Sequence, residues 1–336
     1  MDDRYILPFK EKPYTQMYHN KAFPMGIIQG NTDPDVIMPW LCGKFINCVW
    51  IPESRRTKFD HCIYDDWCTE DKIILQQRID FFPQTYKHLG IEVLEFLKQM
   101  ICSGAYVYGM YNEKYIPGKY AYQRVDRTHD FFIYGYDDNE QAFYSAGYLD
   151  DGIFHAFKIS YTDFGESIKN ILDPKLFFNF YTFNKDTKFE LNMERIIADL
   201  SDYINSRNSK KHYTIDKYYG LEACKMLKEY LGREFKRDKV PDVGYTRAFM
   251  EHKYFMWKRA EYLSAYVFKK PCEYVTALED IYKMAQIIHN LCRKLLFSGT
   301  EQELKKQKVL LLFDEINESE FDVLSNLSSD CINAEK

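Results

Sequence analysis

One histidine of this chain lies where an imidazole could take part in chemistry, at the start of a predicted β-strand. His129 opens residues 128–136, in which aromatic and β-branched residues alternate with polar ones. The same period of a half-buried sheet recurs in residues 105–115 and 141–148. Turn formers in residues 135–140 predict that the last two runs form a hairpin. An imidazole held on such a sheet can take and give a proton near neutral pH.

A second group of chemically capable side chains, His61, Cys62 and Cys68, lies within residues 59–68. His and Cys are zinc ligands, so a metal-dependent hydrolase is one hypothesis, which metal analysis of the purified protein would test. Adjacent strand residues point to opposite faces, however, and no second ligand pair has zinc spacing. A surface loop or an edge strand is the better interpretation, and we expect neither a metal nor a cofactor.

The elements that must position these side chains follow from apolar periodicity. Residues 23–30 resemble a short apolar strand that ends in a turn. Residues 36–45 follow several possible N-caps, and their apolar side chains recur at helical spacing, which predicts a helix. Pro39 is tolerable near the start of that helix. Cys42 lies on that predicted helix. Residues 89–102 place apolar side chains on one face, which predicts a helix that leads into the aromatic strands.

The pattern changes in the C-terminal half, where amphipathic helices follow one another. Two further strands, residues 152–160 and 177–183, come before the change. We therefore expect an α+β domain over residues 1–185 and an all-α domain over residues 186–336. The predicted helices of the second domain are residues 190–207, 216–235, 244–268, 273–297 and 300–328.

The composition is that of a globular chain without a nucleic-acid partner. Its 336 residues are 46% hydrophobic and 17% aromatic, which is enough for a substantial core. The net charge of −5 is spread over interleaved acids and bases, so no basic stripe is available for a phosphate backbone. No run approaches about 18 apolar residues and no apolar signal segment begins the chain, so we expect a cytoplasmic protein with no membrane contact. The nine irregularly spaced cysteines then predict reduced thiols.

Three predicted strands carry a resemblance to a known family: YVYGMYNEKYI, a strand that opens with THDFFIYGYDD, and AFYSAGY. Preceded by a helix, they resemble the central part of papain-like cysteine peptidase domains. Within that group, residues 20–170 look most like the N-terminal domain of the butirosin biosynthesis protein H family, whose members occur in nonribosomal-peptide (antibiotic) gene clusters. The resemblance implies an α+β, papain-like core with an antiparallel sheet packed on helices, followed by an all-α C-terminal region.

The resemblance also implies acyl transfer from the phosphopantetheine thioester of an acyl or peptidyl carrier protein to a small amine. A cysteine at a helix N-terminus is activated by the macrodipole and an imidazole, and a third group fixes the imidazole tautomer. His129 takes the histidine role. Cys42 is the thiol nearest to the nucleophile position, which corresponds to residues 31–35, and Ser145 stands at the orienting position. Gln29 stands where a glutamine donates to the oxyanion hole.

Two functions from different classes follow. In the first, the protein is a secondary-metabolite acyltransferase that forms an amide by a Cys-His mechanism, and Cys42→Ala and His129→Ala should each abolish formation of the acyl-enzyme. In the second, the protein is a catalytically inactive papain-like protein whose cleft binds a carrier-bound intermediate, a peptide product or a partner protein. The lack of a cysteine in residues 31–35 and the uncharged Ser145 are the reasons to consider the second function, whereas the well-kept form of the histidine strand favours the first. The many tyrosines would suit such a binding surface.

Overall fold

The chain folds into two compact units, and each is made of two separate stretches of sequence. Unit 1 comprises residues 1–34 and 66–188, and unit 2 comprises residues 35–65 and 189–336. The predicted boundary at residue 185 falls close to the break after residue 188, but residues 35–65 belong with the helices rather than with the sheet. This computed structural model describes residues 3–52, 58–63, 67–81, 92–172, 176–209, 217–296 and 302–335.

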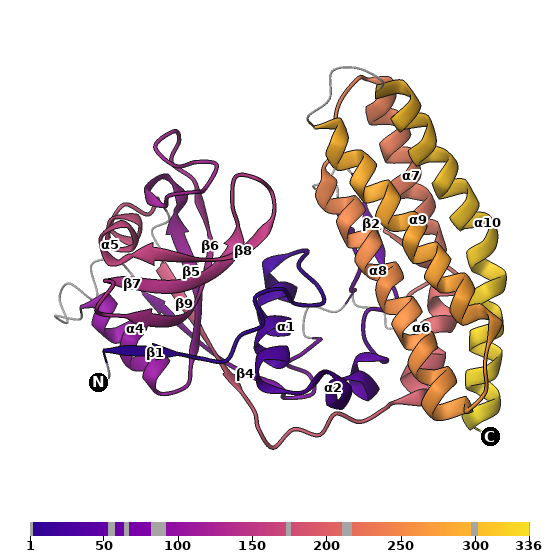
Figure 1. Ribbon diagram of the computed structural model, residues 1–336, viewed down its shortest axis with the longest axis horizontal. Coiled ribbons are helices and arrows are strands. Elements are labelled where there is room, and N and C mark those ends of the chain that lie inside the picture. The colour runs from indigo at the N-terminus through magenta and orange to yellow at the C-terminus, as the bar shows by residue number, and fades with distance from the viewer. Residues whose placement is uncertain are drawn as a thin grey trace. The chain divides into compact units, whose positions relative to one another are not determined.

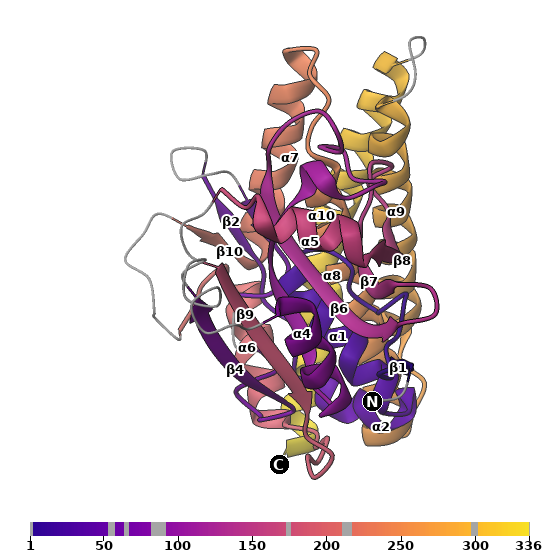
Figure 2. The ribbon, with the colours of Figure 1, turned by 90° about the vertical axis from the view of Figure 1, so that its left-hand side faces the viewer.

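Unit 1 is built on one antiparallel sheet. Its described strands are β1 (Arg4–Ile6), β4 (Ile74–Phe81), β5 (Tyr106–Asn112), β6 (Thr128–Asp137), β7 (Ala142–Tyr148), β8 (Phe154–Ser160) and β9 (Leu176–Phe183). They lie in the order β4-β9-β5-β6-β7-β8, and β1 pairs with β6. Figure 2 looks onto this sheet, with β4 at one side and β8 at the other. The predicted β6–β7 hairpin is confirmed, whereas β4 was not predicted.

Helices cover both faces of this sheet. They are α1 (His19–Asn31), α4 (Val93–Cys102) and α5 (Tyr161–Lys169), and a short 3₁₀ helix, η2 (Glu113–Tyr115), follows β5. Phe164 of α5 packs on Phe131, with ring centroids 5.1 Å apart, while Phe23 of α1 stacks on Phe132 at 4.6 Å. Neighbouring strand residues point to opposite faces, so α1 and α5 lie on opposite sides of the sheet. Figure 1 shows α4 on the same side as α5.

The predicted strand over residues 23–30 is wrong, because these residues form most of α1. Pro24, Gly26 and Gly30 disfavour a helix in isolation, which is why the sequence suggested a strand. Both glycines face Phe9: a Cβ at Gly26 would lie 2.2 Å from Phe9 Cε2, and one at Gly30 would lie 2.6 Å from Phe9 Cα. Phe9 of the N-terminal segment therefore packs closely against Gly26 and Gly30, and this tertiary contact stabilises α1.

Unit 2 is mainly helical, but it also contains a three-stranded sheet in the order β10-β2-β3. The predicted helix over residues 36–45 ends at Leu41. Figure 1 shows α7 to α10 as long helices. No helix among the described residues is both long and apolar enough to cross a membrane. The elements are α2 (Pro34–Leu41), β2 (Val49–Ile51), β3 (Lys58–Asp60), α6 (Met193–Ile204), β10 (Tyr218–Tyr219), α7 (Gly220–Lys236), α8 (Val243–Tyr262), the π-helix η3 (Leu263–Phe268), α9 (Glu273–Leu295) and α10 (Gln302–Glu335).

Candidate functional site

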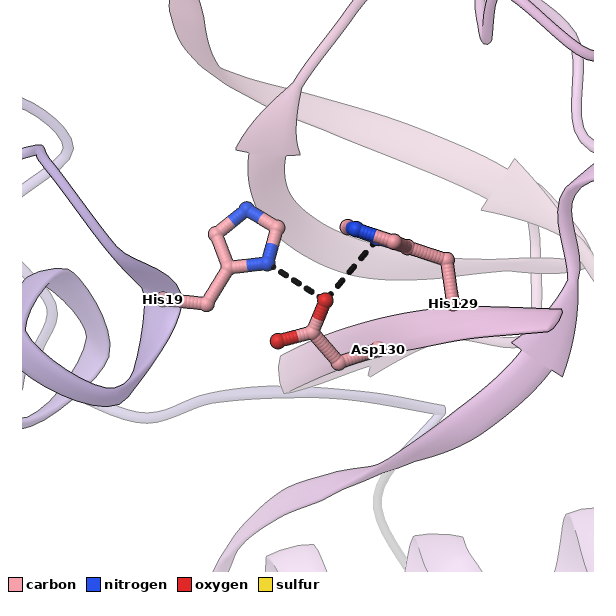
Figure 3. Close-up of side chains that lie close together, drawn as sticks. All are labelled: His19, His129 and Asp130. Atoms are coloured by element: carbon pink, nitrogen blue, oxygen red, sulfur yellow. Dashed lines mark hydrogen bonds and ion pairs between the residues drawn. The ribbon is translucent and has the colours of Figure 1, made fainter. Parts of the chain in front are cut away.

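Two histidines and one aspartate of unit 1 meet where α1 approaches β6. His19 Nδ1 lies 2.7 Å from Asp130 Oδ1, and His129 Nδ1 lies 2.9 Å from the same oxygen. Figure 3 shows the two imidazoles on either side of this carboxylate. The ring centroids of the histidines are 5.5 Å apart. One carboxylate therefore contacts two imidazoles that come from segments 110 residues apart in the sequence.

His19 is positioned by the first turn of α1, of which it is the first residue. Tyr18 precedes it with a φ of 64°, a left-handed conformation that is uncommon for a residue other than glycine. The imidazole stacks on Phe23 at 4.6 Å and on Tyr148 at 5.4 Å between centroids. These contacts bury the side chain and hold its ring against the sheet.

Asp130 and His129 are positioned by the pairing of β6 with β5, in which His129 lies opposite Tyr111 and Asp130 opposite Met110. Asp130 shares its sheet face with Phe132, and that face is the one covered by α1. The second carboxylate oxygen of Asp130 accepts a hydrogen bond of 3.3 Å from the Tyr108 hydroxyl. Both carboxylate oxygens are thus engaged, which fixes the direction of the group.

A second carboxylate and a buried cation stand behind His129. Glu113 Oε1 lies 3.3 Å from His129 Nδ1 and 3.9 Å from Lys119 Nζ. Lys119 Nζ donates a hydrogen bond of 2.6 Å to the Tyr148 carbonyl. Burial lowers the pKa of Lys119 to about 8, although Glu113 and Asp130 raise it. A Cβ on Gly147 would lie 3.4 Å from this ammonium and 3.5 Å from His19 Nε2, so the missing side chain leaves space beside both.

The charge state of the pair formed by His19 and Asp130 follows from burial and from their hydrogen bond. Burial lowers the pKa of His19 and outweighs Asp130, which raises it. Burial also raises the pKa of Asp130, but the contacts with His129 and His19 outweigh burial and lower it overall. An ionised carboxylate only accepts hydrogen bonds, so His19 Nδ1 carries the proton. The neutral ring then has its lone pair on Nε2, a buried atom without a hydrogen-bond partner.

An open pocket of about 340 Å³ gives access to these side chains. Its described lining contains aromatic, imidazole and carboxylate groups but no cysteine, and consists of Met17, Tyr18, His19, Asn20, Tyr108, His129, Asp130 and Tyr148. The pocket can therefore offer a base, a hydrogen-bond donor and metal ligands, but no thiol from this set.

No family model matches this chain, and no curated protein matches its sequence.

The predicted nucleophile, Cys42, belongs to unit 2, whereas His129 belongs to unit 1. Cys42 follows the last residue of α2, so it lies at the C-terminal end of a helix rather than at the N-terminal end. Its side chain is buried, and burial raises the pKa of its thiol to about 12. A thiol in that state is protonated at neutral pH and is a weak nucleophile.

The predicted orienting residue, Ser145, has another partner. It lies opposite Ile133 in the β6–β7 register, four residues along β6 from His129. That separation is about 14 Å at the rise of an antiparallel strand. Ser145 Oγ donates a hydrogen bond of 2.8 Å to the Phe132 carbonyl. Asp130 contacts His129 instead.

Gln29 lies on α1, ten residues after His19. At the rise of an α-helix that distance is about 15 Å. Its Oε1 accepts a hydrogen bond of 2.7 Å from the Tyr14 backbone N–H, so the side chain ties the N-terminal segment to the helix.

The expectation of a surface loop or an edge strand over residues 59–68 holds only in part. Phe59 and Asp60 end β3, which lies at the edge of the three-stranded sheet, but His61 and Cys62 are buried rather than on the surface. The His61 ring stacks on Phe45 at 5.3 Å between centroids. His61 and Cys62 belong to unit 2, whereas Cys68 belongs to unit 1. Apolar packing within unit 2 accounts for the burial of His61, which the polar character of its neighbours in the sequence did not suggest.

Sequence reasoning missed His19 and Asp130. His19 was overlooked because the first buried helix was expected at residues 36–45, so the side chains at the start of α1 were not considered. Asp130 was overlooked because it directly follows His129. The one signal in the sequence was the pair of His129 and Asp130 at the start of a predicted strand. The role of an aspartate beside a candidate imidazole can be tested by substitution without a structure.

Proposed function

We propose that the protein transfers an acyl group from a carrier-protein thioester to an amine, with an imidazole in place of the expected thiol. The resemblance of residues 20–170 to thioester-using acyltransferases supports this substrate class. The mechanism rests on one observation, the hydrogen bond of 2.7 Å between His19 Nδ1 and Asp130. Because Nδ1 donates this bond, Nε2 keeps a lone pair, and His19 is one of the residues that line the pocket.

In the proposed reaction His19 is the general base. Nε2 takes a proton from the attacking amine while the amine nitrogen bonds to the thioester carbonyl carbon. The tetrahedral intermediate then expels the thiolate, which takes that proton from Nε2. The products are an amide and a free thiol, and the imidazole is regenerated. Asp130 holds the ring and stabilises the transient imidazolium.

The place of His19 in the fold supports this assignment. The resemblance implies that the reactive residue stands at the N-terminus of the first buried helix, facing a strand histidine. That helix is α1, and its first residue is His19. His129 is the strand histidine, 5.5 Å away between ring centroids. This placement supports the proposal that His19, rather than residues 31–35, takes the position of the family's reactive residue.

The test is a thiol-release assay with an acyl-pantetheine thioester and a panel of small amines, with amide formation followed by mass spectrometry. His19→Gln and Asp130→Asn should each lower the rate about 10²- to 10⁴-fold, because the base or its orientation is lost. His155→Gln is the matched control, since His155 on β8 forms an exposed pair with Asp151 at 2.8 Å. Cys42→Ala should retain activity. Full activity in His19→Gln would contradict the mechanism.

A second candidate is the catalytically inactive binding protein. The observation that favours it is the lack of a thiol among the described residues that line the pocket. This alternative predicts saturable binding of a carrier-bound acyl group or a peptide with no release of thiol. Amide formation that depends on His19 would rule it out.

A further inference from the structure

The buried Nδ1 atom of His129 forms no aligned hydrogen bond, which is unusual for a polar atom that has been removed from water. It lies only 2.9 Å from Asp130 Oδ1 and 3.3 Å from Glu113 Oε1. A cation can bind where an imidazole nitrogen lies this close to carboxylate oxygens without an aligned hydrogen bond to them.

The donor set suits a divalent transition metal. The ligating atoms of His19, His129 and Asp130 lie within 4.8 Å of one another, and the three form the one such group among the described residues. Imidazole and carboxylate together are common ligands of zinc, with metal–ligand distances of about 2.0–2.2 Å. Tetrahedral geometry at that length separates ligand atoms by about 3.3 Å. The 2.7 and 2.9 Å separations here would have to open by roughly half an ångström.

The surrounding charges favour a cation over an anion. Asp130 places one carboxylate between the two imidazoles. Glu113 adds a second carboxylate beside His129, and it is also near Lys119, 3.9 Å from the ammonium. The carboxylate of Glu113 offsets the positive charge of Lys119, which would otherwise oppose a metal ion.

We propose that His19 Nδ1, His129 Nδ1 and an Asp130 oxygen bind one divalent transition-metal ion, for which zinc is the probe. Metal on Nδ1 of a neutral imidazole requires the ring proton on Nε2. Binding therefore moves the His19 proton from Nδ1 to Nε2 and removes the lone pair there. If His19 is the base of the proposed acyl transfer, a bound ion turns that base off. This last consequence rests on the proposed function, whereas metal binding itself does not.

The binding experiment uses the full chain after treatment with a chelator. Zinc is titrated in competition with a chromophoric chelator, and thermal unfolding is followed with and without zinc. We expect one ion per chain and a rise in Tm on binding. His19→Gln, His129→Gln and Asp130→Asn should each weaken binding by about 10-fold or more. His155→Gln, which removes an exposed imidazole paired with Asp151, should bind as the wild type does.

Three results would overturn the proposal: no stoichiometric zinc binding, unchanged affinity in Asp130→Asn and His19→Gln, or loss of binding in His155→Gln. Thermal unfolding of the metal-free variants shows that each one is folded. Acyl transfer is measured separately, in the presence of chelator. Transfer without zinc binding would refute only the metal site, and zinc binding without transfer would refute only the proposed function. With both present, zinc should inhibit transfer.

Discussion

At the scale of single residues, the contact between His129 and Asp130 runs against the rule that neighbours on a strand point to opposite faces. Asp130 obeys the rule, since it shares a face with Phe132. His129 is the second residue of β6, and its ring reaches the same carboxylate oxygen as His19 does. The strand pattern in the sequence predicts that His129 is a site residue. Its contact with Asp130 depends on how the two side chains rotate at the start of β6, which the spacing of residues does not show.

Ser145→Ala separates a structural role from a catalytic one at this scale. We expect the free energy of unfolding to fall by about 1 kcal/mol, because the buried hydroxyl no longer bonds the Phe132 carbonyl. The rate of acyl transfer should not change. Urea denaturation and the thiol-release assay measure the two effects. Ser167→Ala is the control, since Ser167 is also buried and donates to a phenylalanine carbonyl, that of Phe164, at 2.7 Å. A loss of activity in Ser145→Ala but not in Ser167→Ala would show that Ser145 takes part in the reaction.

At the scale of elements, the site depends on a helix that the local sequence disfavours. α1 presents His19 to the sheet, but it contains Pro24, Gly26 and Gly30. What stabilises the helix is the packing of Phe9 against the two glycines. Strand periodicity predicted most of the sheet, because alternation is a local signal. The position of α1 depends on a contact with a distant segment, so the periodicity of the helix could not reveal it.

Gly30→Ala tests this dependence. A Cβ at Gly30 would lie 2.6 Å from the Phe9 backbone, which cannot move as a flexible side chain can. We expect a loss of about 1–3 kcal/mol in the free energy of unfolding. The rate of acyl transfer should also fall, because α1 is displaced. Gly165→Ala on α5 is the matched control, since its Cβ would meet nothing within 4 Å. That substitution should stabilise the helix by roughly 0.5–1 kcal/mol. Equal effects of the two substitutions in chemical denaturation would contradict the packing argument.

At the scale of the whole molecule, the helical unit is not made from the C-terminal half alone. Its sheet takes β2 and β3 from residues 35–65 and β10 from beyond residue 189. Arg259 of α8 is fully buried and donates hydrogen bonds of 2.6 Å to the carbonyls of Cys42 and Lys44. The change to long helices in the sequence predicted the later boundary, but nothing local marks residues 35–65 as part of the same unit.

A fragment of residues 189–336 should therefore fail to fold by itself. Arg259 would lose two charge-assisted hydrogen bonds, each worth about 1.5–3 kcal/mol, and among its described hydrogen-bond partners would keep only the weak acceptor sulfur of Met256. Circular dichroism during thermal unfolding should show no cooperative transition for the fragment. Addition of a peptide of residues 35–65 should restore one. A sharp transition of the fragment alone would show that the helices are autonomous.

The interleaving of the two units also has an evolutionary consequence. The chain leaves unit 1 after residue 34, returns at residue 66 and leaves again after residue 188. A gene fusion or exchange at any single point within the chain would divide at least one of the two units, because each unit is made of two separate stretches. One such event therefore cannot pass on either unit intact without part of the other, and a relative that carries the sheet without the helices would also have to lack residues 35–65.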